Sequence, residues 1–494
     1  MTAQGLDFLA VDLGASNGRL INGTWDGRQF HLHEVHRFPN GPVHVLGHLH
    51  WDVLHMWQEI QHGLQRYTST SSNPLVSVGV DTWGVDFALL DRSGHLIGNP
   101  YHYRDARTDG MMERAFARVP QEEIFARTGI QFMQLNTLYQ LLSMVEGQHP
   151  ALDVAHTLLM MPDLFHYWLT GVAQTEYTIA STTQLLNAHR REWDKELMEA
   201  LGIPAHLFLP PVNPGSVVGT VREEVRNMCA LPPDVRVITP GSHDTASAVA
   251  AVPELDERSA YISVGTWSLM GVEIPEPIIT EDALRLHFTN EGGVGGSIRF
   301  LHNMTGLWLL QECRRQWQRE GRMYSWEDML ALAEQARPFR CLIDPDALDF
   351  LHPDNMPEAI RTYCARTGQP IPEDDGAVIR CSLESLALKH RWVLDALERL
   401  VEHPLDTVRI VGGGSRNRLL CQYTANACAR PVVAGPVEAT ALGNIMVQAV
   451  ATGHLDSIAA GRAAIAASVP RDTYEPRDTE MWEEAYQRFL NVPN

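Results

Sequence analysis

A strand, a glycine-rich turn and a second strand occur near the start of the chain and again about half a chain later. Phe8–Val11 is an apolar run that leads into Asp12-Leu-Gly-Ala-Ser-Asn-Gly18, and extended chain resumes at Arg19. The second copy runs from 260 to 273 and turns at Gly265-Thr-Trp-Ser268. A dinucleotide-binding βαβ unit would place a helix directly after the glycines, whereas alternating and β-branched residues follow here. The repeat therefore predicts two similar α/β halves and argues against a Rossmann unit.

The rest of the chain alternates helical and strand patterns, which is typical of an α/β protein. Pro and acidic residues gather over 251–257, and this composition predicts a domain boundary. We therefore expect an N-terminal domain over 1–250 and a C-terminal domain over 255–494, with a cleft between them. Helices are expected over 51–68, 138–146, 163–169, 244–252, 306–320, 326–336 and 379–403, and strands over 30–38, 75–80, 85–90, 235–238 and 407–411.

The balance of charge excludes several classes of partner. The sequence has 39 basic and 60 acidic residues, which gives a net charge of −21. Such a surface repels phosphate backbones and anionic lipids, so we expect no nucleic-acid binding and no membrane association. No run approaches the ~18 apolar residues of a membrane span, and the start of the chain lacks the basic region of a signal peptide. We therefore expect a cytoplasmic protein.

Lysine is nearly absent, and this limits how ATP could be bound. The sequence has two lysines, Lys195 before Glu196 and Lys389 before His390. A P-loop requires Gly-Lys-Ser/Thr, and a protein kinase requires a lysine in an apolar strand, so neither arrangement is available. If the chain handles ATP, it does so by another scheme.

Three glycine-rich turns are candidates for binding a phosphorylated ligand. Small residues after Asp12 let several backbone amides approach one anion, and the Asp12 carboxylate is suited to hydrated Mg²⁺. Gly265 and the hydroxyls of Ser263–Ser268 could face the same phosphates. The glycines of Val411-Gly-Gly-Gly-Ser-Arg-Asn417 permit a flat ring to lie on bare backbone. Taken singly, each turn is also explained as an ordinary hairpin or connector.

A fourth candidate is Gly241-Ser-His-Asp-Thr-Ala-Ser-Ala-Val249, where a small-residue helix follows a buried strand. Asp244 is the only carboxylate in this segment. It could cap the helix, which is common for Asp, or act as a base beside a substrate. The two roles do not exclude each other.

Together the three turns resemble the phosphate-1, phosphate-2 and adenosine pattern of the actin, Hsp70 and sugar-kinase ATPases, which uses no P-loop lysine. The sequence is more specifically similar to the FGGY family of carbohydrate kinases and, within it, to members that phosphorylate L-rhamnulose. The resemblance covers about residues 8–450. It rests on Ala10-Val-Asp-Leu-Gly-Ala-Ser, Asp81-Thr-Trp-Gly-Val-Asp-Phe, Tyr103-Arg-Asp-Ala-Arg-Thr, Ser242-His-Asp-Thr-Ala-Ser-Ala-Val, Gly265-Thr-Trp-Ser-Leu-Met-Gly, Thr289-Asn-Glu-Gly-Gly, Asn303, Gly306-Leu-Trp-Leu-Leu-Gln311 and Gly435-Pro-Val-Glu-Ala.

The resemblance implies two ribonuclease-H-like domains of the actin, Hsp70 and hexokinase type, with an interdomain cleft that binds ATP, Mg²⁺ and a ketose. The implied reaction is ATP-dependent phosphorylation of L-rhamnulose at its 1-hydroxyl, giving L-rhamnulose 1-phosphate and ADP in L-rhamnose catabolism. Asp244 would be the general base, and Asp12 would contact Mg²⁺ through water. The implied sugar-binding residues are Gly84, His243, Asp244, Thr245 and Asn303, and the implied ATP-binding residues are Ala15, Ser16, Asn17, Gly18, Arg19, Thr266, Gln311 and Gly413.

Two features depart from the common pattern of the family or extend it. Tyr139-Gln140 stands where the wider family more often has Pro-Lys, which bears on the sugar contacts. The resemblance also allows a disulfide between Cys364 and Cys381. Seven cysteines without a Cys-x-x-Cys are otherwise typical of reduced, buried thiols in a cytoplasmic chain.

Other functions remain open at the level of sequence. One alternative is another ketose or polyol kinase of the same family, acting on L-fuculose or D-xylulose. The other is an Hsp70-like ATPase without kinase activity, which would need a peptide-binding domain after the ATPase. About forty residues follow Val450, and they have the pattern of a terminal helix. We expect a monomer or a weak homodimer.

Overall fold

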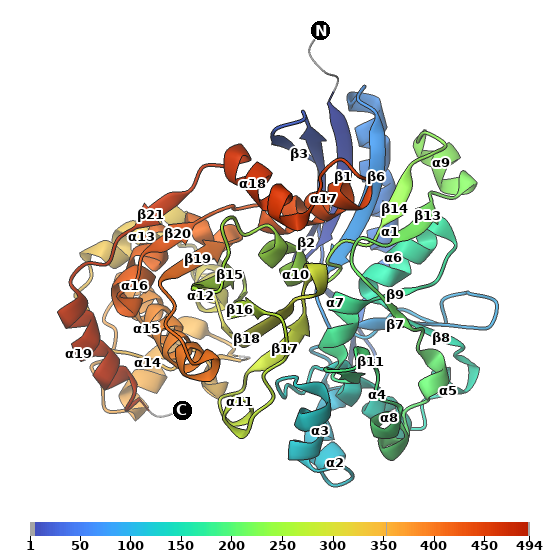
Figure 1. Ribbon diagram of the computed structural model, residues 1–494. Coiled ribbons are helices and arrows are strands. Elements are labelled where there is room, and N and C mark those ends of the chain that lie inside the picture. Colours follow the sequence, from blue (N-terminus) through green and yellow to red (C-terminus); the bar gives the residue numbers. More distant parts are fainter. Residues whose placement is uncertain (1–4, 352, 493–494) are drawn as a thin grey trace. The chain divides into compact units, whose positions relative to one another are not determined.

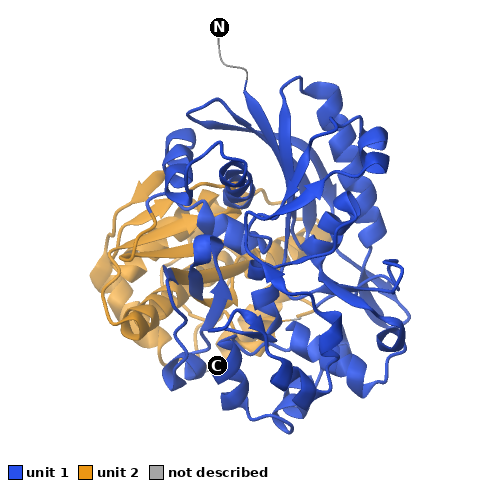
Figure 2. Ribbon diagram, turned by 45° about the vertical axis from the view of Figure 1, so that its right-hand side comes forward, with its two compact units in different colours: residues 1–254, 273–300, 439–469 blue, residues 255–272, 301–438, 470–494 orange. Residues whose placement is uncertain are grey.

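The computed structural model describes residues 5–351 and 353–492. The chain divides into two compact units (Figure 2). Unit 1 comprises Met1–Glu254, Glu273–Phe300 and Ala439–Val469, and unit 2 comprises Leu255–Val272, Leu301–Glu438 and Pro470–Asn494.

Unit 1 is built on a six-stranded sheet in the order β13-β14-β6-β1-β2-β3. The first three strands form an antiparallel meander, as the sequence predicts, and β6 and β14 then pair in parallel on the other side of β1. Seven of the eight residues of β1 are buried, because helices cover the sheet. The strands are β1 (Leu6–Leu13), β2 (Asn17–Trp25), β3 (Phe30–Pro39), β6 (Leu75–Thr82), β13 (Val217–Thr220) and β14 (Arg236–Ile238).

Helix α1 (Val53–Thr70) illustrates why these residues form a helix on the sheet. Met56, Ile60 and Leu64 recur at helical spacing and are buried in the core of the sheet. The Asp52 side chain accepts a hydrogen bond from the backbone N–H of His55 and caps the first turn. The expected helix over 51–68 is thus confirmed, with a start two residues later because Asp52 is its cap.

The remaining elements of unit 1 surround the sheet and form a second apolar cluster beside it. The helices are α2 (Met111–Phe116), α3 (Gln121–Thr128), α4 (Thr137–Glu146), α5 (Ala151–Val154), α6 (Met161–Thr170), α7 (Tyr177–Ala180), α8 (Lys195–Leu201), α9 (Glu223–Cys229), α10 (Asp244–Ala250), α11 (Glu281–Arg285), α17 (Ala439–Ala451) and α18 (Ile458–Ser468), with 3₁₀ turns η1 (Ala106–Thr108), η2 (Ser181–Thr183), η3 (Ala205–Leu207) and η4 (Val294–Gly296). The short strands are β4 (Pro42–Val45), β5 (His48–Trp51), β7 (Phe87–Leu90), β8 (Thr157–Met160), β9 (Thr175–Glu176), β10 (Leu186–Asn187), β11 (Glu192–Trp193) and β12 (Pro211–Val212).

The second large sheet has seven strands in the order β17-β18-β16-β15-β19-β20-β21; β17 belongs to unit 1, and the other strands lie wholly or mostly in unit 2. It repeats the arrangement of the first sheet, because the antiparallel hairpin β15–β16 lies beside the parallel strands β19 and β20. The predicted repeat of the hairpin is therefore confirmed. The strands are β15 (Ser259–Val264), β16 (Trp267–Ile274), β17 (Thr289–Gly292), β18 (Ile298–Thr305), β19 (Thr407–Val411), β20 (Val432–Ala434) and β21 (Asp472–Tyr474).

Long helices make up most of the rest of unit 2. They are α12 (Trp308–Arg319), α13 (Trp326–Gln335), α14 (Met356–Arg366), α15 (Asp375–Val401), α16 (Arg418–Cys428) and α19 (Thr479–Phe489), with 3₁₀ turns η5 (Leu348–Phe350) and η6 (Gly413–Arg416). The helices expected over 306–320, 326–336 and 379–403 correspond to α12, α13 and α15.

Unit 1 is not continuous in sequence. One of its later segments contains α17, which packs on the first sheet (Figure 1). Gln448 Nε2 donates a hydrogen bond to the carbonyl of Leu9 in β1 at 2.9 Å, and Ser77 Oγ in β6 donates to Gln448 Oε1 at 2.7 Å. Residues 439–469 therefore belong to unit 1, although they follow most of unit 2 in the sequence.

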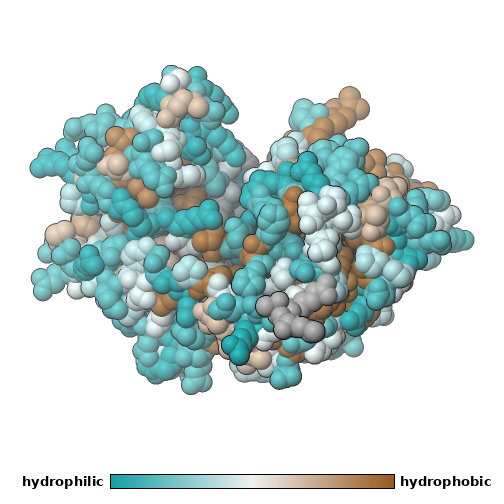
Figure 3. Space-filling view, turned by 90° about the horizontal axis from the view of Figure 1, so that it is seen from above, coloured by the Kyte–Doolittle hydropathy of each residue, from teal (hydrophilic) through white to brown (hydrophobic). Residues whose placement is uncertain are grey.

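The surface agrees with the acidic composition. In the view of Figure 3, hydrophilic residues dominate and hydrophobic residues form small, separate patches. Among the helices of the described residues, none has both the length and the apolar character needed to cross a bilayer.

Candidate active site

Three aspartates converge at one edge of the first sheet. Asp12 and Asp81 are directly paired positions of the parallel strands β1 and β6. One residue further on, Thr82 forms a bridge with His243, and its backbone N–H donates to the carbonyl of Ser242 at 2.9 Å. The bridge brings Asp244, at the start of α10, to the edge where Asp12 and Asp81 lie. Carboxyl ends of parallel strands are where ligands bind in open α/β sheets.

Asp81 has a buried oxygen that no group of the protein satisfies. Asn444 Nδ2 donates a hydrogen bond to Asp81 Oδ2, whereas Asp81 Oδ1 is buried without a hydrogen-bond partner. Burial raises the pKa of the Asp81 carboxyl well above its usual range, and the negative charges of Asp12 and Asp244 raise it further. An unsatisfied carboxylate oxygen beside two other carboxylates is suited to a cation.

Asp244 does not cap the helix that it begins. Helix α10 begins at Asp244, His243 occupies the N-cap position, and no side chain caps this helix. The Asp244 side chain is 30% exposed, and its Oδ1 accepts a hydrogen bond from Thr245 Oγ1 at 3.0 Å. The capping interpretation is therefore wrong for Asp244, and one carboxylate oxygen stays accessible.

His243 connects Asp244 with a buried ion pair. Arg299, which is fully buried, donates from Nη2 to His243 Nδ1 at 3.0 Å and pairs with Glu291 Oε2, also at 3.0 Å. His243 Nδ1 also lies 3.3 Å from Glu291 Oε2, so His243, Arg299 and Glu291 form one buried cluster. On the other side of the ring, His243 Nε2 lies 3.5 Å from Asp244 Oδ1. The sequence motifs contain Glu291, but neither it nor Arg299 was assigned a role.

The turn after β1 and the start of β2 carry five consecutive residues that are expected to contact ATP, Ala15 to Arg19. The N–H of Gly14 donates to the carbonyl of Asn17 at 2.9 Å and closes the turn, with Ala15 half-buried and Ser16 exposed at its tip. Arg19 forms an ion pair with Asp12. Gly18 has a packing reason of its own, because a Cβ there would lie 2.2 Å from the Phe38 ring.

Gly84 lies in the loop between β6 and β7, three residues after Asp81. A Cβ on Gly84 would lie 3.2 Å from the side chain of Thr182, which leaves little room for a larger residue. The next residue, Val85, has φ 67° and donates from its N–H to Thr182 Oγ1 at 3.1 Å. This left-handed conformation is uncommon for a β-branched residue and fixes the course of the loop.

The buried carboxyl group of Asp86 accepts several hydrogen bonds at the end of this loop. The indoles of Trp83 and Trp51 donate to Asp86 Oδ2 at 2.9 and 2.5 Å, and Gln140 Nε2 donates to Asp86 Oδ1 at 2.8 Å. Burial raises the pKa of the Asp86 carboxyl to about 6. Gln140, of the unusual Tyr139-Gln140 pair, thus binds the carboxyl group of Asp86 and stabilises the loop that contains Gly84.

In unit 2, the expected nucleotide contacts gather at one edge of the second sheet. Strands β15 and β19 run in parallel, with Ser263 paired to Val411, so the turns that follow them lie at the same edge. Thr266 Oγ1 donates to Gln311 Oε1 at 3.2 Å. Gly413 begins the 3₁₀ turn directly after β19. Thr266, Gln311 and Gly413 are therefore brought to one region.

The three consecutive positions after β19 differ in whether the fold itself requires glycine there. Gly412 has φ 82°, a conformation that favours glycine. A Cβ on Gly414 would lie 2.2 Å from the side chain of Val264. A Cβ on Gly413 would meet nothing within 4 Å. The fold thus explains two of the glycines, and the space beside Gly413 is available to a ligand.

The expected sugar-binding residues are divided between the units. Gly84, His243, Asp244 and Thr245 belong to unit 1, whereas Asn303 lies on β18 in unit 2. All seven cysteines are buried free thiols, so the disulfide that the resemblance allows between Cys364 and Cys381 is not formed.

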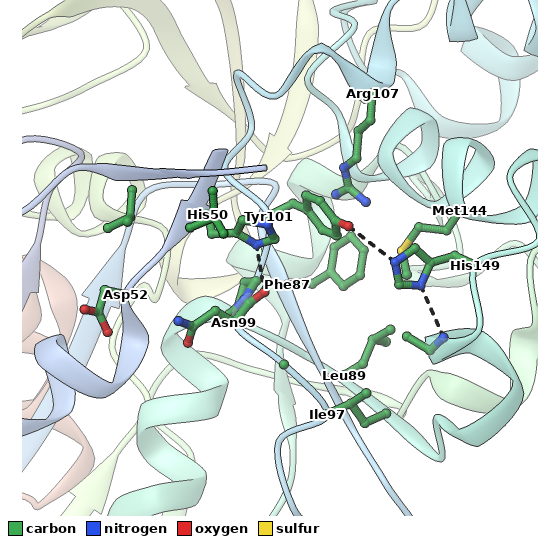
Figure 4. A pocket seen from close by; sticks show the side chains of 15 residues that line it. His50, Asp52, Phe87, Leu89, Ile97, Asn99, Tyr101, Arg107, Met144 and His149 are labelled. Atoms are coloured by element: carbon green, nitrogen blue, oxygen red, sulfur yellow. Dashed lines mark hydrogen bonds between the residues drawn. The ribbon is translucent and has the colours of Figure 1, made fainter. Parts of the chain in front are cut away.

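Unit 1 also has a cavity of about 380 Å³ that none of the expected site residues lines (Figure 4). The guanidinium of Arg107 lies 4.0 Å from the centre of the Tyr101 ring, and Tyr101 Oη is 3.3 Å from His149 Nε2. Phe87, the first residue of β7, lines this cavity.

Comparison with known proteins agrees with this geometry. The model of the FGGY family of carbohydrate kinases, N-terminal domain, matches residues 8–251, and that of the C-terminal domain matches residues 260–452. A protein named rhamnulokinase from Bacteroides thetaiotaomicron is 47% identical over 485 residues, covering 98% of this chain and 99% of that protein. A rhamnulokinase from Pectobacterium atrosepticum is 42% identical, covering 98% of this chain and 96% of that protein.

Solved structures share the fold at low sequence identity. Gluconate kinase from Lactobacillus acidophilus superposes with a TM-score of 0.81 at 16% identity, covering 99% of this chain and 97% of that one. Plasmodium falciparum glycerol kinase with ADP gives a TM-score of 0.77 at 15% identity, covering 98% of each chain. With both domain models matched and relatives above 40% identity along nearly its whole length, the chain belongs to the FGGY family of carbohydrate kinases and has the two-domain α/β fold of actin- and hexokinase-type ATPases.

Proposed function

We propose that the protein phosphorylates L-rhamnulose at its 1-hydroxyl with ATP, giving L-rhamnulose 1-phosphate and ADP in L-rhamnose catabolism. Full-length relatives named rhamnulokinase at 42–47% identity support the substrate. The observation that carries the chemistry is the accessible carboxylate of Asp244, held at the sheet edge beside His243 and Thr245. Family membership removes the alternative of a chaperone-like ATPase without kinase activity. We further propose a cytoplasmic enzyme that acts as a monomer or weak homodimer.

Asp244 is the general base of this proposal. Its free oxygen accepts the proton of the 1-hydroxyl as the hydroxyl oxygen bonds to the γ-phosphorus and the bond to the β-phosphate oxygen breaks. Thr245 Oγ1 donates to Oδ1, and His243 Nε2 lies 3.5 Å from the same oxygen, so these contacts orient the side chain before the sugar binds. Gly84 and Asn303 would complete the sugar contacts.

The nucleotide would be bound by two sets of groups. Ala15, Ser16, Asn17, Gly18 and Arg19 would face the phosphates from the turn after β1. Thr266, Gln311 and Gly413 would contact the nucleotide from unit 2. Mg²⁺, when bound with ATP, neutralises charge on the phosphates. The unsatisfied Asp81 Oδ1 fits such a cation, with Asp12 contacting it through water.

Gly413→Val should raise the KM for ATP strongly and leave the affinity for the sugar in the absence of ATP nearly unchanged. A side chain fits at Gly413 without any clash in the protein itself, so it would compete only with a ligand ring resting on the backbone. Steady-state kinetics and sugar titration check this. Gly98→Val is the control, because nothing lies within 4 Å of that glycine either. An unchanged KM for ATP in folded Gly413→Val would show that the turn is only a connector.

L-Rhamnulose should exceed L-fuculose, D-xylulose and glycerol in kcat/KM. Trp83 in the Gly84 loop packs on Trp51 with ring centres 3.9 Å apart and the ring planes tilted by 32°, which makes this part of the loop apolar. Burying the methyl group of a 6-deoxy sugar contributes about 1 kcal/mol, or roughly 5-fold in kcat/KM. A coupled ADP-release assay over these four substrates measures the order. A preference for glycerol or D-xylulose would contradict the substrate while leaving the family assignment intact.

A further inference from the structure

Three cysteines that are distant in sequence meet in unit 2. Cys341 lies in the segment after α13, Cys364 in α14 and Cys381 in α15. Their sulfur atoms all lie within 4.8 Å of one another, and all three side chains are buried. Within residues 5–351 and 353–492, no other three His, Cys, Asp or Glu side chains meet this spacing. None of the three belongs to the residues proposed to bind ATP or the sugar.

The fold holds Cys341 in place from both sides. The backbone N–H groups of residues 339, 342 and 343 donate to the side chains of Glu384, Gln369 and Ser385 at 2.8, 2.8 and 3.0 Å. Glu384 and Ser385 follow Cys381 by about one turn of α15. The N–H of Gln369 donates to the carbonyl of Cys364 at 2.9 Å. The segments that carry the three sulfur atoms are thus tied together by hydrogen bonds that do not involve sulfur.

The cluster offers three sulfur donors and no oxygen donor, a set that suits a metal ion with a preference for sulfur. The thiolate is the form that binds metal ions. The nearby Glu384 carboxylate is paired with Arg380 Nε at 2.7 Å, so it is occupied within the protein.

We propose that Cys341, Cys364 and Cys381 form a three-thiolate site for a soft d¹⁰ cation, Cu(I) or Zn(II). A metal–sulfur bond of about 2.3 Å in a trigonal site places the sulfur atoms about 4 Å apart, which the observed spacing approaches with small side-chain movements. Thiolate sulfur selects these ions over Mg²⁺ and Ca²⁺. Binding forms three metal–sulfur bonds, releases the protons of the three thiols to solvent, and changes no oxidation state. A disulfide would instead need sulfur atoms about 2 Å apart and would use only two of the three.

Competition titration of the reduced, chelator-treated full-length protein under anaerobic conditions tests the proposal. Zn(II) and Cu(I) are added separately against a chromophoric chelator, which distinguishes the two ions. We expect one ion per chain, with Cys341→Ser weakening the affinity ~100-fold because one of three ligands is lost. Cys428→Ser is the matched control, since Cys428 is also buried in unit 2 but lies outside the cluster, and it should bind as the unsubstituted chain does. Turnover should stay within about twofold in Cys341→Ser, because the site takes no part in phosphoryl transfer.

A second measurement does not depend on a variant that folds. In the unsubstituted protein, the bound ion should protect the three thiols from alkylation under partial denaturation, as read by peptide mass spectrometry, while the other four cysteines react equally with and without it. Equal reactivity of all seven thiols, or unchanged affinity in Cys341→Ser, would overturn the proposal. The proposal would also be overturned if the fully reduced protein bound neither ion. The three cysteines would then be packed thiols without a metal-binding role.

Discussion

Asp244→Asn should lower kcat at least ~10²-fold while the protein stays folded and still binds ATP. The amide has nearly the same size but cannot accept the proton of the 1-hydroxyl, and general-base catalysis contributes typically ~10²–10⁴-fold. Helix α10 has no side-chain cap to lose, because His243 and not Asp244 stands at the N-cap. The melting temperature should therefore change by no more than about 3 °C. Coupled kinetics, nucleotide titration and calorimetry measure the three quantities.

Glu281→Gln is the matched control for charge and position. Glu281 is the first residue of α11, as Asp244 is of α10, and it is exposed. Neutralising it should leave turnover within about twofold, because surface substitutions away from a site have small effects. If Asp244→Asn lost stability but kept its turnover, Asp244 would be a structural residue and the proposed mechanism would be wrong.

Gly443→Ala should both destabilise unit 1 and impair turnover. Helices α17 and α10 approach so closely that a Cβ on Gly443 would lie 1.8 Å from the carbonyl oxygen of Ser247, a backbone atom that cannot rotate away. Ser247 stands one helical turn after Asp244, so separating the helices moves the proposed base. Forced overpacking costs typically ~1–3 kcal/mol, and a displacement of about 1 Å at a reacting group can cost ~10²-fold in rate. Thermal unfolding and kcat are the measurements.

Gly461→Ala separates this effect from ordinary helix packing. A Cβ on Gly461 of α18 would also clash, but with the side chain of Met446, which is flexible and can shift. We expect a smaller loss of stability and unchanged turnover for that variant. Equal behaviour of Gly443→Ala and Gly461→Ala would mean that the approach of α17 to α10 does not position Asp244.

The hairpins and most helices could be predicted because their patterns are local. Glycine-rich turns between short apolar strands mark both meanders, and apolar spacing marks α1. The start of α15 was placed at residue 379 but lies at Asp375, where the Asp374 side chain accepts a hydrogen bond from the N–H of Ala377. The first three residues of the helix, Asp375, Gly376 and Ala377, carry no large apolar side chain, so an apolar pattern misses this turn although Asp375 and Gly376 are buried.

The sequence predicts site residues that stand out within one continuous segment. It does not predict those whose importance comes from contacts between segments that are distant in the chain. Asp244 stands out in its own segment as a lone carboxylate after a buried strand. Asp81 was contained in a motif, but its importance comes from its pairing with Asp12 across two strands. Arg299 reaches His243 only because the chain returns to unit 1 after residue 272. No local pattern marks such contacts, and the meeting of Cys341 with two other cysteines is of the same kind.

The return of α17 to the first sheet has a consequence during synthesis. Asn444, which bonds to Asp81, and Gly443, which supports α10, emerge from the ribosome long after residue 254. At ~5–20 residues per second, the 189 residues between positions 254 and 443 take about 10–40 s to make. During that time α17 does not yet cover the sheet of unit 1. The apolar residues that α17 later buries are therefore exposed, and they can bind chaperones or aggregate. The unit that carries the proposed base is thus completed only after residues 439–469 have been made.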